Sequence, residues 1–198
     1  MIDYFHKLTH GVSIKCLGNT ILRIGTSVTY ERFLRTPGLK HHDKFVVSWI
    51  LKGEGRYQED GNSFPITDFT VCIRRPDRDY TMELYVKSSV RLFLDLPDEI
   101  YKTMILLVPE LNTISPVVSS PFCQEYWNEF MSLRTTFDEV APDDVYKLLP
   151  AMIHFICDIT GIFAQREKLP LFRAKRMLDD VSSTLSLQEI AEFCNLNY

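Results

Sequence analysis

The sequence FVVSWILKGEG, residues 45–55, is the stretch that decides the fold. Its run of β-branched and aromatic residues is typical of a strand, and the closing glycines, Gly53 and Gly55, mark a turn. Working outward, similar short runs separated by Gly, Pro, Asp and Asn extend over residues 14–96. We therefore expect an antiparallel sandwich or barrel, with strands at residues 20–25, 29–33, 45–52, 55–59, 68–74 and 82–94.

After residue 97 the apolar period changes from two toward about 3.6, which predicts helices. One helix is expected over residues 120–137, with Pro121 in its first turn. A second is expected to begin at Asp143 or Asp144 and to end before Pro170. Pro150 either kinks this second helix or marks its true beginning, because proline removes a hydrogen bond to the preceding turn.

The apolar sector of this second helix is wide. One face can pack on the β region while the other meets a second copy of the chain, so we predict a homodimer. Burial of the whole helix inside its own monomer explains the sector equally well. The residues assigned to dimerisation are Leu149, Met152, Ile156, Ile159 and Phe163.

Composition limits the classes of protein. The chain has 198 residues, of which 45% are hydrophobic and 24% charged, as expected for a folded domain with an appendage or for two small domains. No apolar stretch is long enough to cross a membrane, and no secretory signal begins the chain, so we expect a cytoplasmic protein. The five cysteines are scattered and indicate neither a disulfide framework nor a zinc site. A net charge of -4 gives no support to nucleic-acid binding by the bulk of the chain.

The C-terminal residues carry a more specific pattern. A helical stretch at residues 171–181 is followed by Ser186 and Glu189, which form a capping box that opens a helix. Ala191 and Asn195 have the spacing of the small residue and the turn residue of a helix-turn-helix. An ordinary terminal amphipathic helix is the alternative. Residues 171–198 hold three basic and four acidic residues, and the recognition helix would begin only beyond Tyr198.

Taken together, the β-rich half, the helices and residues 186–196 resemble the arabinose-regulator (AraC/XylS) family of bacterial transcription factors. Residues 45–55 are similar to the family's strand that ends in Gly-x-Gly, and residues 76–80, Pro-Asp-Arg-Asp-Tyr, to its Pro-x-x-His-Tyr turn. The resemblance implies an α+β fold, in which a cupin-like barrel of the double-stranded β-helix type is followed by amphipathic helices. It divides the chain into an effector-binding barrel (1–97), a helical dimerisation segment (98–168), and a linker with the start of a helix-turn-helix (169–198).

The resemblance also raises the question of a metal, because cupin enzymes use two histidines, a glutamate and a third histidine. The corresponding positions here hold Lys40, His42, Val46 and Asp79, so one histidine of three remains. We therefore expect no metal, no cofactor and no enzymatic activity. A cupin-fold isomerase or oxygenase and a dimerisation module without a ligand are the alternatives.

The expected partners are a small polar effector such as a sugar, a second copy of the chain, and DNA through the full-length protein alone. Strand alternation places Val46 and Ser48 inside the barrel and Trp49 outside, whereas a slip of one residue would turn Trp49 toward the ligand. Arg35 resembles an arginine that reaches the effector in some sugar-responsive members. The predicted ligand-binding residues are Arg35, His42, Ser48, Trp49, Arg75, Asp79 and Tyr80, although a surface ion-pair patch explains the charges at residues 74–79 equally well.

Overall fold

The structure is a computed structural model that describes residues 11–17, 20–30, 34–36, 44–85 and 88–163. Residues 1–160 form one compact unit and residues 161–198 a second. Everything that follows concerns the first unit unless stated otherwise. The predicted helices at residues 171–181 and from Ser186, with Glu189, Ala191 and Asn195, lie outside the described residues.

A six-stranded antiparallel sheet forms the larger half of the barrel. Its strand order is β1-β2-β9-β4-β7-β10, so strands far apart in the sequence become neighbours. The central strand β4 pairs with β9 on one side and with β7 on the other. The bounds are β1 Gly11–Leu17, β2 Thr20–Tyr30, β4 Lys44–Lys52, β7 Thr70–Arg74, β9 Ser88–Pro97 and β10 Val117–Ser119.

A four-stranded antiparallel sheet forms the smaller half, in the order β3-β8-β5-β6. Its bounds are β3 Leu34–Thr36, β5 Gly55–Glu59, β6 Asn62–Ile66 and β8 Tyr80–Leu84. Asp60 and Gly61, both with positive φ, form the two-residue turn between β5 and β6. Gly55 is required for a different reason: a Cβ there would lie 1.9 Å from the carbonyl oxygen of Glu83 on β8. The second glycine of the Gly-x-Gly sequence therefore lies where the backbones of β5 and β8 approach each other very closely.

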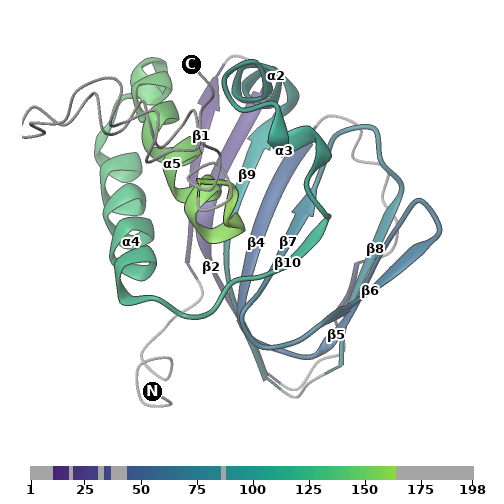
Figure 1. The fold of residues 1–198 in the computed structure, drawn as a ribbon. Helices are drawn as coiled ribbons and strands as arrows, with labels where there is room; N and C mark the ends of the chain where they lie inside the picture. The colour runs from purple at the N-terminus through teal and green to yellow at the C-terminus, as the bar shows by residue number, and fades with distance from the viewer. Residues whose placement is uncertain (1–10, 18–19, 31–33, 37–43, 86–87, 164–198) are drawn as a thin grey trace, which may run out of the picture. The chain divides into compact units, whose positions relative to one another are not determined.

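The helices cover the outer face of the six-stranded sheet (Figure 1). Both α4 and the 3-10 helix η1 contact β1, and α5 packs against α4 and η1, whereas α2 contacts β4 and β9. None of the helices in the described ranges is long and apolar enough to span a membrane. The bounds are α2 Asp98–Leu107, α3 Glu110–Thr113, α4 Gln124–Glu139, η1 Pro142–Leu148 and α5 Leu149–Thr160.

Alternation along β4 and β9 divides the sheet into two chemically different faces. The outward side chains of β4, such as Phe45, Val47 and Trp49, are buried. Trp49 stacks with Phe122, and its indole Nε1 donates a hydrogen bond to the carbonyl oxygen of Ser120 at 3.1 Å. The outer face thus forms an apolar core under the helices, and a second buried cluster that includes Ile50, Tyr57 and Met82 lies between the sheets.

The fold class agrees with the expectation: antiparallel sheets come first and helices follow, in an α+β fold. The strands expected at residues 45–52, 55–59 and 68–74 are confirmed, and α5 begins at Leu149, so Pro150 marks a beginning and not a kink. The strand expected over residues 82–94 is two strands, β8 and β9. Residues 20–30 form one continuous strand, β2.

Six elements were not expected from the sequence: β1, β3, β6, β10 and the helices α2 and α3. The strand β6 contains Pro65, and proline argues against a strand because it has no amide hydrogen to donate. An edge strand tolerates proline, and β6 is the edge strand of the smaller sheet. The short strand β10 exists because it pairs with β7, a tertiary contact that leaves no local pattern.

Candidate functional site

A cavity of about 290 Å³ lies between the two sheets. The larger sheet contributes the side chains of one face, and the smaller sheet contributes Tyr57, Tyr80 and Met82. Polar and charged groups are unusually frequent for a barrel interior. The lining residues are Val12, Arg23, Ser27, Val46, Ser48, Tyr57, Cys72, Arg74, Tyr80, Met82, Arg91, Phe93 and Asp95.

Arg74, on β7, reaches the cavity beside Tyr80 of β8. Its guanidinium lies 4.6 Å from the centre of the Tyr80 ring, and its Nη1 donates a hydrogen bond to the Tyr80 hydroxyl. The buried Nε has no hydrogen-bond partner among the described residues. A charged group is therefore positioned by an aromatic ring, with one of its donors left unused.

Arg91, on β9, enters the same cavity from the other side of β4. Its guanidinium lies 5.5 Å from the centre of the Phe93 ring, and its Nε also lacks a described partner. Burial, and then the charge of Arg74, lower the pKa of Arg91 from its ordinary value. The guanidinium of an arginine nevertheless keeps its proton in proteins, so two cations share one enclosed space.

Asp95 is the one carboxylate among the lining residues. Its Oδ2 lies 3.8 Å from Nε of Arg23, and its Oδ1 lies 3.5 Å from Nζ of Lys44. The register explains the first pair, because Arg23 of β2 stands opposite Asp95 of β9. Asp95 is thus shared by two cations, Arg23 of β2 and Lys44 of β4, which flank β9 on its two sides.

Two further groups of the lining stay protonated. Burial raises the pKa of Cys72 to about 12, so this residue is a thiol and not a thiolate at neutral pH. Burial, followed by the charge of Glu59, raises the pKa of Tyr57 above its ordinary value. The Tyr57 hydroxyl donates to Oε2 of Glu59 at 2.8 Å. Neither group is activated as a nucleophile.

The structure brings two of the predicted ligand-binding residues to the cavity, Ser48 and Tyr80. Trp49 lies on the outer face of β4, so its assignment to the ligand is corrected: alternation turns it into the core under the helices. Asp79 lines an open surface hollow at the β5–β6 turn and not the cavity. Arg35 belongs to β3, whose side chains are not described, and His42 lies outside the described residues.

Arg75 has a structural partner set, so its assignment to a ligand is also corrected. Its Nε donates to the carbonyl oxygen of Leu111 at 3.0 Å, and its Nη2 donates to the carbonyl oxygen of Ile114. Its Nη1 lies 3.6 Å from Oε1 of the buried Glu59. Arg75 joins the segment that follows α2 to the barrel, and it is absent from the cavity lining.

Sequence reasoning missed the arginines of the cavity, Arg23, Arg74 and Arg91. The pattern of residues 90–96 contains the signal, because Arg91 and Asp95 alternate with apolar residues whose side chains are buried. Charged residues at alternate positions of an apolar strand share one face, and that face is either solvated or lines a cavity. The sequence does not tell whether the charged face is solvated or lines a cavity, because both arrangements give the same alternation of charged and apolar residues.

The structure does not leave most of the α5 residues that were expected to form the dimer surface at the surface of the chain. Met152, Ile156 and Ile159 are buried within the chain, so their assignment to a dimer surface is corrected. The reason is that α5 is enclosed by α4 and η1 as well as by the sheet, and so both parts of its apolar sector are used. Leu149 is half-buried, and Phe163 lies beyond the end of α5.

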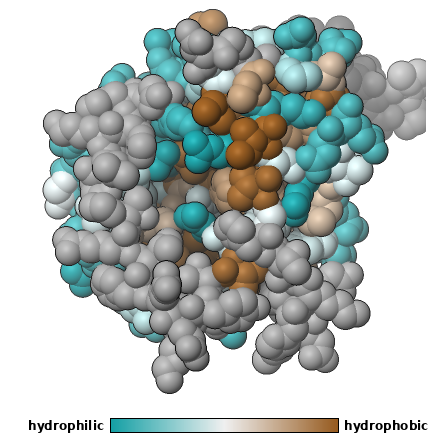
Figure 2. Space-filling model, turned by 180° about the vertical axis from the view of Figure 1, so that it is seen from behind, coloured by the Kyte–Doolittle hydropathy of each residue, from teal (hydrophilic) through white to brown (hydrophobic). Residues whose placement is uncertain are grey.

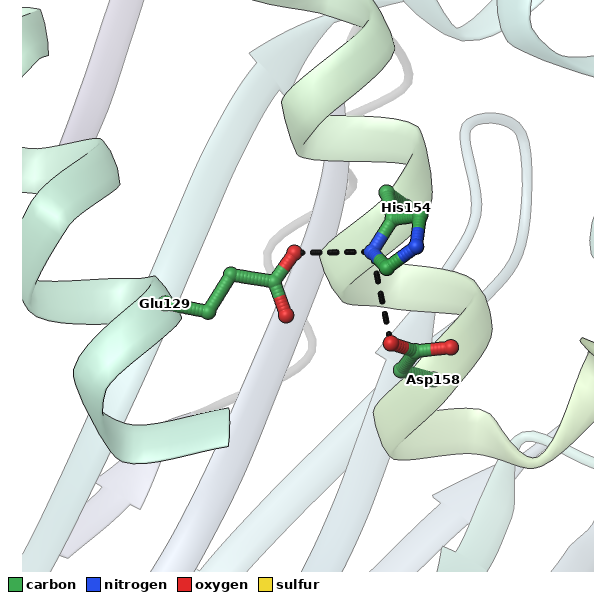
Figure 3. A group of neighbouring side chains, drawn as sticks. All are labelled: Glu129, His154 and Asp158. Carbon is green, nitrogen blue, oxygen red and sulfur yellow. Dashed lines mark hydrogen bonds and ion pairs between the residues drawn. The ribbon is translucent and has the colours of Figure 1, made fainter. Parts of the chain in front are cut away.

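A cluster of potential metal ligands lies on the helices, outside the barrel (Figure 3). Nδ1 of His154 lies 3.0 Å from Oε1 of Glu129 and 3.3 Å from Oδ2 of Asp158. The His154 side chain is 61% exposed, which is typical of a solvated ion-pair cluster. It is the one grouping of three such ligands found in the described ranges. Of the four positions at which cupin enzymes hold a metal, Val46 lines the cavity and Asp79 does not; Lys40 and His42 are not described.

No protein-family model matches the sequence, and no curated protein matches it. Among solved structures, the AraC-like transcriptional activator CuxR is similar with a TM-score of 0.54 and 13% identity, over 94% of this chain and 70% of that one. ToxT from Vibrio cholerae has a TM-score of 0.41 and 11% identity, over 88% and 72% of the two chains. The cupin domain of Schizosaccharomyces pombe Cnp3 has a TM-score of 0.37 and 10% identity, over 50% and 75%. The chain is thus structurally similar over most of its length to an AraC-like regulator, and at this identity the likeness concerns the fold.

Proposed function

We propose that this chain is the effector-binding and dimerisation region of an AraC-type transcriptional regulator in the cytoplasm. In this proposal the barrel binds a small polar molecule, and the bound molecule changes how a C-terminal helix-turn-helix domain contacts DNA. The observation that carries the proposal is the partly open cavity between the two sheets, whose lining includes serine and tyrosine hydroxyls and three guanidinium groups. A barrel that only stabilised the chain would gain more from an apolar interior.

The arrangement of the two sheet faces supports the same reading. Helices cover the outer face, which leaves the inner face to bind a ligand without loss of the apolar core. A ligand acts as a switch only when it binds two arrangements of the protein with different affinity. Of the two strands that carry the cavity's arginine pair, β9 leads directly into α2, and β7 pairs with β10. In this proposal a bound ligand acts through these connections on segments outside the barrel.

A homodimer remains part of the proposal, although its surface is not the buried stripe of α5. Large apolar side chains stay exposed at two places in the described part of the chain. Leu106 and Leu107 close α2, while Val12, Ile14 and Ile21 belong to the outermost hairpin, β1 and β2. Figure 2, the view from behind that of Figure 1, shows apolar side chains gathered among polar ones on that face of the molecule. Such patches are typical of surfaces that meet another protein.

The rival reading is a cupin-fold isomerase or oxygenase, which needs a metal held inside the barrel. The described lining offers one carboxylate, which two cations share, and one thiol that stays protonated. Neither is a strong ligand in this state, because metals bind thiolates and free carboxylates. Metal analysis of the purified chain distinguishes the readings: a stoichiometric transition metal would favour the enzyme.

The proposal is tested with a longer protein that includes a complete helix-turn-helix domain. A ligand found by thermal-shift screening of sugars and small acids against the present chain should change that protein's affinity for promoter DNA. Thermal shift is a suitable screen because a ligand that binds only the folded state raises its melting temperature. A ligand that stabilises the barrel and leaves DNA affinity unchanged would contradict the regulatory function.

A further inference from the structure

We infer that the ligand of the barrel carries an oxyanion, a carboxylate or a phosphoryl group, which binds between Arg74 and Arg91. The inference rests on the proposed function in one respect, namely that the cavity holds the effector, and it adds the chemical class of that effector.

The first argument is the charge of the lining. Three guanidinium groups line the cavity, and Asp95 is the one carboxylate among the lining residues. Asp95 is shared by Arg23 and Lys44, at 3.8 Å and 3.5 Å. Among the described residues, no carboxylate lies within ion-pair distance of Arg74 or Arg91. The cavity lining therefore has an excess of positive charge, which no described carboxylate compensates at Arg74 or Arg91.

The second argument is the unused donors. The Nε atoms of Arg74 and Arg91 are buried without a described hydrogen-bond partner. A buried guanidinium is costly unless it is paired and hydrogen-bonded, and it cannot relieve the cost by losing its proton. The guanidinium groups of Arg74 and Arg91 also repel each other, and after burial the charge of Arg74 contributes to the lowered pKa of Arg91. An anion in the cavity would remove both costs at once.

The third argument is orientation. The guanidinium of Arg74 lies over the Tyr80 ring and that of Arg91 over the Phe93 ring. Nη1 of Arg74 donates to the Tyr80 hydroxyl, so its other N–H groups remain for a ligand, and the edge of a guanidinium matches the two oxygens of a carboxylate or phosphoryl group. Both side chains are thus held in place before the ligand arrives, which lowers the entropy cost of binding.

The rest of the lining sets the size and character of the ligand. A volume of about 290 Å³ is at the lower end of small-molecule sites, so it suits a small metabolite. Ser27 and Ser48 offer hydroxyl groups, whereas Val46 and Met82 offer apolar contacts. A neutral sugar would use the hydroxyl groups but would leave the two charges uncompensated.

Isothermal titration calorimetry and thermal unfolding of the present chain test the inference, with three probes at constant ionic strength. The probes are inorganic phosphate, succinate and glucose. We expect saturable binding and a higher melting temperature with phosphate or succinate, and neither with glucose. Binding of phosphate alone assigns a phosphoryl ligand, and binding of succinate alone assigns a carboxylate.

Variants locate the binding. Arg74→Met and Arg91→Met should each raise the dissociation constant of the bound probe by about tenfold or more, because each removes charge-assisted hydrogen bonds. Arg56→Met is the matched control, since Arg56 is an exposed arginine on β5 outside the cavity lining. It should bind the probe as the parent chain does.

A second measurement separates loss of binding from loss of folding. Without any probe, Arg91→Met should melt at the same temperature as the parent chain or higher, because it removes a half-buried cation whose buried Nε has no described partner. Equal probe affinity in the parent chain, Arg74→Met and Arg91→Met would overturn the inference. Glucose binding without phosphate or succinate binding would also overturn it, while effector binding by the barrel would stand.

Discussion

The two faces of the six-stranded sheet differ more than any other two regions of this molecule. On β9, the side chains of Val90, Leu92 and Leu94 are buried under the helices. The side chains that alternate with them along the strand, Arg91, Phe93 and Asp95, line the cavity. One strand thus contributes to the apolar core with one face and to the cavity lining with the other.

Two adjacent arginines show the same contrast on a smaller scale. Arg75 donates to two carbonyl oxygens and faces the carboxylate of Glu59. Arg74 faces the cavity, with a buried Nε that has no described partner. The paired arginine stabilises the fold, and the arginine with an unused donor is available to a ligand. The predictions below test this division, beginning with the largest effect.

The strongest test of the apolar face is Ile156→Glu in α5. Ile156 is fully buried, so the variant places a charge in the core and should lower the free energy of unfolding by at least about 4 kcal/mol. Denaturant unfolding measures the loss. Ala151→Glu, at an exposed position of the same helix, is the control and should change stability by less than about 0.5 kcal/mol. A folded monomer from Ile156→Glu would instead place Ile156 at a dimer surface.

Arg75→Met tests the paired arginine. It leaves Glu59 without its buried cationic partner and removes the donors of two carbonyl oxygens, which should cost about 3–5 kcal/mol of unfolding free energy. Chemical denaturation followed by circular dichroism is the measurement. The contrast with Arg91→Met, which we expect to be neutral or stabilising, is the decisive comparison. Equal losses in the two variants would show that pairing does not distinguish the two faces.

Val47→Ala and Val46→Ala compare the faces with one substitution at adjacent positions of β4. Val47 is buried under the helices, so its truncation leaves a cavity in the core and should cost about 2 kcal/mol. Val46 already lines a cavity, so its truncation should cost less than about 1 kcal/mol. The same unfolding experiment measures both. If Val46→Ala proves to be the more damaging change, the inner face contributes more to stability than we infer.

The smallest expected effect is the reactivity of Cys72. With a pKa of about 12, its thiol stays protonated at pH 8, and the folded chain should protect it from iodoacetamide. The exposed Cys16 should react under the same conditions. Mass spectrometry of the alkylated peptides reads the two sites separately, and unfolding in urea should make Cys72 reactive. Fast alkylation of Cys72 in the folded chain would mean that the cavity is open to solvent.

Much of the fold was predictable because it depends on local pattern. The alternation of residues 45–51 predicted which side chains of β4 face the helices, and Trp49 and Ser48 lie on the expected faces. Asp60 and Gly61 predicted a turn, because these residues adopt positive φ at low cost. Pro150 predicted a helix boundary for a similar local reason.

The residues that line the cavity were less predictable. Ser48 and Tyr80 line it as expected, but Arg75 was preferred to its neighbour Arg74, and Arg91 was not considered. The choice between Arg74 and Arg75 depends on which face of β7 looks into the barrel, and β7 obtains its orientation from pairing with β4. The choice of Ile156 as a dimer residue failed for a related reason, since the partner that covers it is α4 of the same chain.

By itself, the sequence determined the succession of strands, turns and helices, because period, glycine and proline act over a few residues. Only the tertiary structure decided which charged residues share the cavity. Arg74 and Arg91 are separated along the chain by the whole of β8, and they line one cavity because β7 and β9 both pair with β4. The pairing of Asp95 with Arg23 and Lys44 likewise depends on strand order. Electrostatic pairing follows distance in space, and no local pattern contains that distance.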